Sequence, residues 1–253
     1  MSSSKRAAGV RAADLVEDGM RLGLGTGSTV FYFLEALGQR IRDEGLKVTG
    51  VPTSIDTQGK CAEFGIALAT LADVDALDLT IDGADEIDGD FQMIKGGGGA
   101  LLQEKIVATA SDQMIVIADI GKEVETLGAF PLPVEVIPFG WQTTKALVEE
   151  MLISMDVLGR NVTLRMNGEA PFVTDEGNHI VDLHLSRIGD ARKLSLVLNQ
   201  IPGVVENGLF IDICDKVVIG HQDGLVEVID INEGTHHEDR ITFADDDNIF
   251  SDL

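Results

Sequence analysis

The chain has 253 residues and a formal net charge of −24, because 43 acidic side chains are set against 19 basic ones. A field of this sign excludes a general affinity for nucleic-acid phosphates or anionic membranes, so we expect no nucleic-acid and no membrane partner. The hydrophobic fraction of 44% is too high for an acidic disordered chain. The length suits one large domain or two unequal domains with a substantial core.

The excess of carboxylates fits either an ordinary acidic cytosolic protein or halophilic adaptation. A dense carboxylate surface repels itself in dilute buffer, and salt screens that repulsion. Cys61 and Cys214 are too few for a disulfide framework and too far apart for a zinc motif. With no signal-peptide core and no apolar run long enough to span a membrane, the sequence predicts a protein of the reducing cytoplasm.

The first half of the chain alternates helical and strand patterns. In chain order we predict a helix over 5–18, a strand over 20–24, a helix over 30–43, a strand over 47–53, a helix over 55–64, strands over 66–71 and 77–81, a helix over 99–110 and a strand over 113–118. Several of these strands are apolar throughout, which is typical of strands buried on both faces. The fold class predicted is α/β, with a Rossmann-like, mainly parallel sheet and helices on both faces.

The pattern changes in FPLPVEVIPF (130–139), where three prolines punctuate the chain. We predict, in order, a strand over 134–137, a helix over 143–155, strands over 161–166 and 179–185, a helix over 190–199 and a strand near 203–206. This is the β-α-β-β-α-β order of a ferredoxin-like domain.

The expected domains follow from that order. Residues 1–129 begin the large catalytic domain, 130–206 form the inserted small α+β domain, and 207–231 return to the large domain through strands over 209–213, 215–219 and 225–231. Residues 232–253 are acidic and weakly patterned, so we expect a flexible or loosely docked tail.

The first glycine loop, GLGTGST (23–29), lies between a predicted strand and a predicted helix. Glycines allow close approach of a ligand, and the N–H groups at a helix start favour an anion. A tight turn with no ligand is the alternative. A dinucleotide fingerprint is disfavoured because Ser28 occupies the third glycine position and no carboxylate follows the second strand. A mononucleotide or sugar phosphate fits better.

Two further segments carry polar groups or glycines that suit a ligand. The acidic turn DGADEID (82–88) follows an apolar strand, where carboxylates accept hydrogen bonds from hydroxyls or move protons; an acidic surface turn is the alternative. The second glycine loop, KGGGG (95–99), precedes a helix that carries Glu104. Lys122 follows another apolar strand and is placed to reach a phosphate. Alone, Glu104 and Lys122 would be ordinary surface residues, and no metal site is expected.

Together these segments resemble type A ribose-5-phosphate isomerase. The resemblance covers about residues 5–230 and rests on GLGTGST (23–29), DGADEID (82–88), KGGGGALLQEKI (95–106), ADIGK (118–122), FPLPVEVIPF (130–139) and VENGLF (205–210). The tail at 232–253 falls outside it, and Gly99 stands where the family often has alanine.

The resemblance implies interconversion of D-ribose 5-phosphate and D-ribulose 5-phosphate in the pentose phosphate pathway, without metal or organic cofactor, by a homodimer or homotetramer. It places at the catalytic centre Glu104, Asp82, Asp85 and Lys95, and around the substrate Thr26, Gly27, Ser28, Thr29, Gly83, Ala84, Gly96, Gly97, Gly98 and Lys122. The chemistry agrees, because one carboxylate held near both carbons serves as base and then as acid. Asp82 is the first choice for opening the sugar ring, with Asp85 binding hydroxyls or sharing that task.

Other classes remain open at this point. A sugar-phosphate sensor domain would normally carry a basic DNA-binding segment, which this chain lacks. A CoA-transferase-like enzyme on a similar scaffold would use a glutamate nucleophile and form a covalent thioester.

Overall fold

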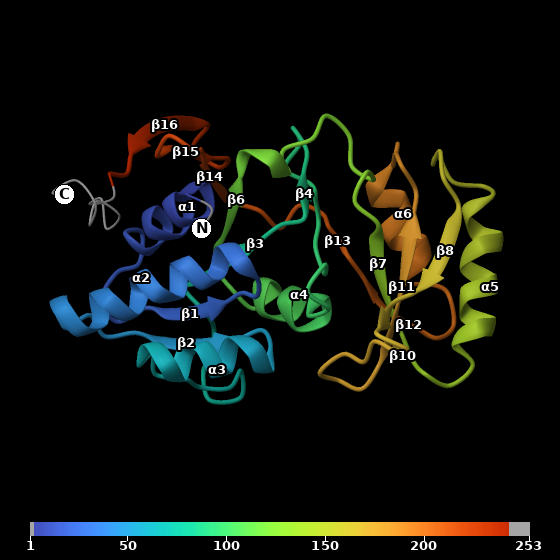
Figure 1. Ribbon diagram of the computed structural model, residues 1–253, viewed down its shortest axis with the longest axis horizontal. Coiled ribbons are helices and arrows are strands. Elements are labelled where there is room, and N and C mark those ends of the chain that lie inside the picture. Colours follow the sequence, from blue (N-terminus) through green and yellow to red (C-terminus); the bar gives the residue numbers. More distant parts are fainter. Residues whose placement is uncertain (1–2, 243–253) are drawn as a thin grey trace, which may run out of the picture.

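The computed structural model describes residues 3–242, which form an α/β molecule (Figure 1). In chain order its elements are α1 (Ser3–Ala13), β1 (Arg21–Leu24), α2 (Ser28–Glu44), β2 (Thr49–Pro52), α3 (Ile55–Phe64), β3 (Leu79–Gly83), β4 (Glu86–Ile87), β5 (Met93–Ile94), α4 (Leu101–Thr109), β6 (Met114–Asp119), the 3-10 helix η1 (Ile120–Lys122), β7 (Leu132–Val136), α5 (Trp141–Leu152), β8 (Asn161–Leu164), β9 (Met166–Asn167), β10 (Ala170–Pro171), β11 (His179–His184), α6 (Ala191–Leu198), β12 (Val204–Asn207), β13 (Leu209–Phe210), β14 (Lys216–Gly220), β15 (Leu225–Asp230) and β16 (Thr235–Arg240).

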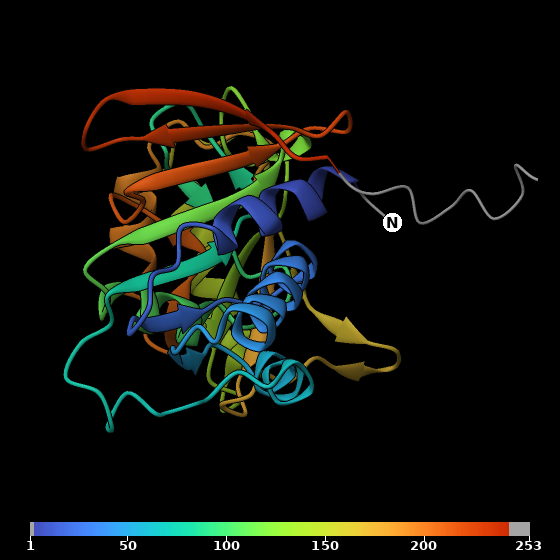
Figure 2. The ribbon, with the colours of Figure 1, turned by 90° about the vertical axis from the view of Figure 1, so that its left-hand side faces the viewer.

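The largest sheet has seven strands in the order β16-β15-β14-β6-β3-β1-β2. The five strands from β14 to β2 are parallel, and β15 and β16 extend the sheet in antiparallel fashion. Figure 2 shows this sheet with α1 and α2 crossing one of its faces. The mainly parallel α/β architecture predicted from the apolar strands is confirmed.

Side chains of β6 divide between the two faces of the sheet, as the pleat requires. Ile115 and Ile117 pack with the buried side chains of α1 and α2. Met114 and Val116 pack on the opposite face with Phe210 and Ala108, from β13 and α4. Burial on both faces explains why this strand has no alternation of polar residues in its sequence.

A second sheet has four antiparallel strands in the order β12-β7-β11-β8. Its elements follow one another along the chain as β7, α5, β8, β11, α6 and β12, and its strands share one apolar core with Val148 of α5 and Leu194 of α6. A three-stranded sheet, β13-β5-β4, lies between the two larger sheets (Figure 1). The short hairpin of β9 and β10 projects from the four-stranded sheet (Figure 2).

The short strands β4, β5, β9 and β10 were not predicted from the sequence. Three further differences concern the end of α1, residues 66–71 and β16. The first helix ends at Ala13 instead of residue 18. Arg40 Nη1 donates to the carbonyls of Ala13 and Val16, which have no partner within the helix. Residues 66–71 form no named strand, and only Leu68 bridges to Gly50.

Among residues 3–242, no helix is long and apolar enough to cross a membrane.

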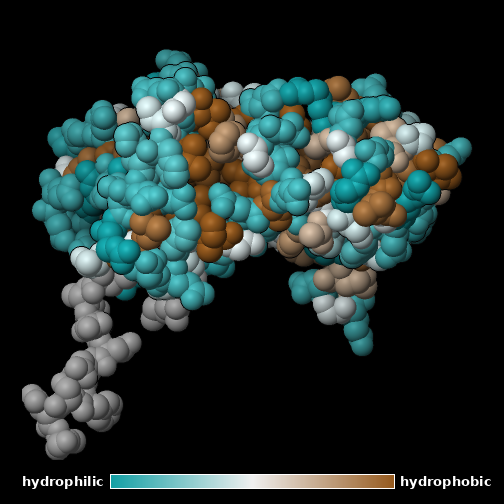
Figure 3. Space-filling view, turned by 90° about the horizontal axis from the view of Figure 1, so that it is seen from above, coloured by the Kyte–Doolittle hydropathy of each residue, from teal (hydrophilic) through white to brown (hydrophobic). Residues whose placement is uncertain are grey.

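The third difference is β16, which falls where the sequence suggested a loosely docked tail. It pairs with β15 over its full length, while residues 243–253 lie outside the described residues. Its letters, THHEDR, show no apolar alternation because the strand lies at the sheet edge and is largely exposed. The backbone ladder and ion pairs such as Arg11–Asp239 hold it instead. Seen from above, hydrophilic residues cover this end of the molecule, beside a more hydrophobic band (Figure 3).

Candidate active site

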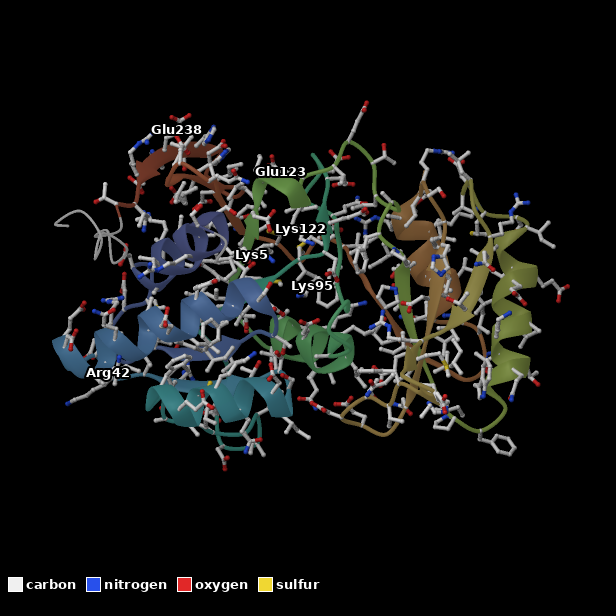
Figure 4. All side chains as sticks on the ribbon, in the orientation of Figure 1. Lys5, Arg42, Lys95, Lys122, Glu123 and Glu238 are labelled. Carbon is white, nitrogen blue, oxygen red and sulfur yellow. The ribbon has the colours of Figure 1, made fainter. Side chains whose placement is uncertain are left out.

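One pocket gathers the three polar segments singled out in the sequence. Strands β1, β3 and β6 are parallel, so their carboxyl ends meet at one edge of the sheet, and the loops that follow them line the pocket. The lining residues are Lys5, Thr26, Gly27, Ser28, Thr29, Gly83, Ala84, Asp85, Lys95, Gly96, Gly97, Gly98, Glu104 and Lys122. Figure 4 shows Lys5, Lys95 and Lys122 in this region, between α2 and β4.

The first glycine loop fits closely against the acidic turn. A Cβ on Gly25 would lie 2.1 Å from Asp82 Oδ1, so only glycine allows this approach. Gly27 has φ 124° and precedes α2, whose first turn has no side-chain cap. The N–H groups at the start of α2 therefore remain available to an anion beside Ser28.

Thr26 lines the pocket, but its hydroxyl is engaged elsewhere. Its Oγ1 lies 2.8 Å from both Thr53 Oγ1 and Ser54 Oγ and 3.1 Å from Thr57 Oγ1, at the start of α3. Its backbone N–H donates to Asp82 Oδ1 over 3.1 Å. Thr26 thus joins the loop to α3 and to the acidic turn through groups that are already satisfied.

Three ionisable side chains meet at the bottom of the pocket. Lys95 Nζ lies 2.9 Å from Asp82 Oδ2 and 3.4 Å from Glu104 Oε1, and it donates to the carbonyl of Gly83 over 2.5 Å. All three side chains are buried, and Glu104 Oε2 has no hydrogen-bond partner among the described residues. Since Glu104 also lines the pocket, its unpartnered carboxylate oxygen is a candidate for contact with a ligand.

The environment of Glu104 changes its acidity. Burial, reinforced by the negative charge of Asp82, raises the pKa of Glu104 to about 8, although Lys95 opposes the shift. Burial disfavours the charge of Lys95, but Asp82 and Glu104 outweigh it, so the pKa of Lys95 is raised. The site therefore combines the carboxyl group of Glu104, which can exchange a proton near neutral pH, with Lys95, which stays protonated beside it.

Asp85 and the second glycine loop form the next part of the wall. Gly97 donates its N–H to Asp85 Oδ2 over 2.7 Å, and a Cβ on Gly97 would lie 2.6 Å from Asp85 Oδ1. Asp85 is partly exposed in the pocket. Asp82 is fully buried, and its Oδ1 accepts from the N–H groups of Thr26 and Gly83. The two aspartates of the acidic turn therefore have different access to a ligand.

Positive charge without a carboxylate partner lines the pocket beside the start of α2. Lys5 Nζ lies 2.8 Å from Ser28 Oγ, and Lys122 from η1 lines the same pocket. Neither lysine forms an ion pair within the described part of the chain. Lys5 was not predicted from the sequence, because the spacing of α1 from the glycine loop gives no signal that they meet.

The remaining residues predicted from the sequence to contact the substrate also lie at the pocket. Gly27, Ser28, Thr29, Gly83, Ala84, Gly96 and Gly98 all border the pocket. Over residues 3–242, no group of three or more His, Cys, Asp or Glu side chains is arranged to hold a metal ion.

Comparisons with known proteins agree on one family. The family model described as ribose 5-phosphate isomerase A (phosphoriboisomerase A) matches residues 49–224. A ribose-5-phosphate isomerase A from Ruegeria pomeroyi is 70% identical over 253 residues, which are 100% of this chain and 97% of that relative. The solved ribose 5-phosphate isomerase A from Methanocaldococcus jannaschii is 40% identical, with a TM-score of 0.82, and the match covers 89% of this chain and 97% of that one.

A further solved D-ribose-5-phosphate isomerase was determined in complex with phospho-erythronic acid. It is 40% identical, with a TM-score of 0.82, and the match covers 89% of this chain and 97% of that chain.

Proposed function

The chain belongs to the ribose 5-phosphate isomerase A family and interconverts D-ribose 5-phosphate and D-ribulose 5-phosphate, and we propose that Glu104 moves the proton between C1 and C2. The observation that carries this assignment is the buried carboxyl of Glu104, whose pKa is raised to about 8 and whose Oε2 is unpartnered at the pocket. The high identity of the relatives disfavours a sensor domain or a CoA-transferase-like enzyme.

The chemistry requires a base that later acts as an acid. Ionised Glu104 takes the proton from C2 of the open-chain aldose, and electrons shift to the carbonyl to give an enediolate. Glu104 then returns that proton to C1, while the hydroxyl proton passes from O2 to O1. Lys95 and the N–H group of Gly98 stabilise the negative charge that develops on oxygen.

The phosphate group binds at the other end of the pocket. The N–H groups at the start of α2, with the hydroxyls of Ser28 and Thr29, suit an anion at a helix N-terminus. Lys5 and Lys122 add positive charge, and neither is neutralised by a carboxylate of the described chain. This arrangement leaves the sugar carbons to extend toward Glu104.

Opening of the sugar ring falls to Asp85 in this proposal, rather than to Asp82 as first expected from the sequence. Asp85 borders the pocket and is partly exposed. Asp82 is 0% exposed, and its oxygens are occupied by two backbone N–H groups and by Lys95. Its proposed role is to hold Lys95 protonated and in place.

The direct test is an assay of ribulose 5-phosphate formation from ribose 5-phosphate by the purified full chain, with EDTA present and at both low and high KCl. We expect turnover under both conditions without added metal. Absence of turnover in every condition would refute the function, and a thioester detected by mass after incubation with acyl-CoA would favour the transferase alternative.

Assembly as a homodimer or homotetramer and a cytoplasmic location belong to the same proposal. The loops that flank α5 beside the four-stranded sheet carry exposed apolar side chains, with Phe139 90%, Leu158 71% and Ile153 67% exposed. Covering such side chains with a second copy would remove apolar area from water. Light scattering of the purified chain should give a mass above 27.1 kDa; a monomer at all concentrations would refute the assembly.

A further inference from the structure

One side chain next to the four-stranded sheet contacts the second glycine loop on the side away from the pocket. Arg165 follows β8, and its Nη1 donates to the carbonyls of Gly96 and Gly97 over 2.9 and 3.1 Å. These carbonyls belong to the second glycine loop, whose other side borders the pocket. Arg165 itself is absent from the pocket lining, so it acts on the loop and not on a ligand.

The guanidinium of Arg165 is held in a fixed orientation. Its Nε donates to Asp182 Oδ2 over 2.9 Å, and its Nη2 pairs with Asp182 Oδ1, so the carboxylate is gripped at two points. The side chains of Arg165 and Asp182 are only 15% and 16% exposed. The ring of Phe172 lies 5.9 Å from Arg165 Cζ and sits against Gly99, where a Cβ would come within 2.4 Å of it.

The peptide units of the glycine loop transmit this contact to the reacting groups. In a trans peptide the carbonyl and the N–H point in opposite directions. The carbonyl of Gly96 accepts from Arg165, and the N–H of the same peptide unit, on Gly97, donates to Asp85. The carbonyl of Gly97 also accepts from Arg165, which turns the N–H of Gly98 away from Arg165. A positively charged donor bound to a carbonyl also polarises the peptide unit, which makes its N–H a stronger hydrogen-bond donor.

We propose that Arg165 is a positioning residue for the isomerisation: it orients two glycine peptides so that one N–H holds Asp85 and the next faces the developing enediolate. The inference rests on the proposed function of the pocket. Four consecutive glycines have wide conformational freedom, and hydrogen bonds from a fixed guanidinium restrict it together with the bond from the Gly99 N–H to the Gly96 carbonyl. Lysine cannot replace this arginine, because it lacks the planar fork that binds Asp182 and two carbonyls together.

The test compares Arg165→Ala and Arg165→Lys with the matched control Arg187→Ala. Arg187 pairs with Asp156 in an exposed ion pair of the same sheet region and does not contact the glycine loop. We expect Arg165→Ala to lower kcat by roughly 10- to 100-fold with KM within about threefold, since small displacements of groups that act on the transition state have such effects. Arg165→Lys should resemble the alanine variant, and Arg187→Ala should resemble the wild type.

Two readouts separate positioning from general disruption. Guanidinium ion at millimolar concentration should restore part of the kcat of Arg165→Ala and leave Arg187→Ala unchanged. Phospho-erythronic acid, whose carboxylate resembles the enediolate oxygens, should bind Arg165→Ala more weakly by roughly 10-fold, whereas erythritol 4-phosphate, which lacks that charge, should keep its affinity.

Wild-type kcat in Arg165→Ala would overturn the positioning role, as would equal loss of affinity for both ligands without rescue by guanidinium. If Arg165→Ala does not fold, Asp182→Asn serves in its place, because it frees the guanidinium while leaving it present; the same drop in kcat is expected, and unchanged kcat would refute the role. Inactivity of the wild type and of Arg187→Ala would instead refute the proposed function.

Discussion

Replacing Glu104 by glutamine removes the proposed acid and base while leaving the shape of the side chain nearly unchanged. General acid–base groups contribute roughly 10²- to 10⁴-fold to turnover, so we expect Glu104→Gln to lower kcat by that factor. Binding of phospho-erythronic acid should persist, because the phosphate end of the pocket is untouched. A Glu104→Gln variant with near-normal kcat would remove Glu104 from the mechanism.

The pKa of Glu104 also sets the pH profile of the wild type. With a value of about 8, roughly one molecule in eleven carries the ionised base at pH 7, and about ten in eleven carry it at pH 9. The value of kcat/KM should therefore rise about 10-fold over that interval. The phosphate of the substrate, with a second pKa near 6, is already a dianion in this range. A flat profile between pH 7 and pH 9 would contradict the raised pKa.

The same shift has a consequence for stability. Because the pKa of Glu104 is raised from 4.5 in the unfolded chain to about 8, the folded state binds this proton more tightly. The stability that this group contributes is fully present below the unfolded pKa and is lost as pH rises through the folded one. Glutamine has no such loss, so the Tm of Glu104→Gln relative to wild type should be higher at pH 9 than at pH 5. A Tm difference independent of pH would refute the reasoning.

Three further predictions concern the pocket and the surface. Lys122→Ala and Lys5→Ala should each raise KM by roughly 10-fold, as loss of a charge-assisted bond to phosphate implies, with the exposed Lys47→Ala as control and an unchanged KM as the contrary result. Asp85→Asn should slow ring opening, so kcat should fall more with ribose 5-phosphate than with ribulose 5-phosphate as the substrate. An equal fall of kcat with both substrates would assign ring opening to another group. The Tm should rise between dilute buffer and molar KCl, where the Debye length falls to about 3 Å, and an unchanged Tm would exclude adaptation to salt.

The parts of the fold that were predictable from the sequence are those fixed by local patterns. Val116 and Ile117 lie in a continuous apolar run, which indicates a strand buried on both faces, and the first glycine loop marks the carboxyl end of β1. β16 was not predictable, because an exposed edge strand is held by its backbone ladder and needs no apolar pattern.

The parts of the site that the sequence did not indicate depend on contacts between distant segments. Lys5 reaches Ser28 from another helix, and Arg165 meets Gly96 across 69 positions of the chain. A lone lysine or arginine carries no spacing signal, so only the arrangement of the sheets brings such residues to the pocket. Thr26 shows the opposite case. It lies inside the recognised motif, but its hydroxyl forms hydrogen bonds with Thr53, Ser54 and Thr57 and not with the pocket.

The charge of −24 and an anionic substrate are compatible because the pocket has its own local balance. Lys5, Lys95, Lys122, Asp85 and Glu104 line the pocket and Asp82 pairs with Lys95, so protonation of Glu104 at neutral pH leaves one positive charge in excess. When Glu104 gives up its proton to become the base, that excess disappears, so the bound phosphate dianion and the ionised base compete for the same cations. Lys95 lies between Asp82 and Glu104, whereas Lys5 lies beside Ser28 at the start of α2, so the ionised base and the phosphate interact with different cations.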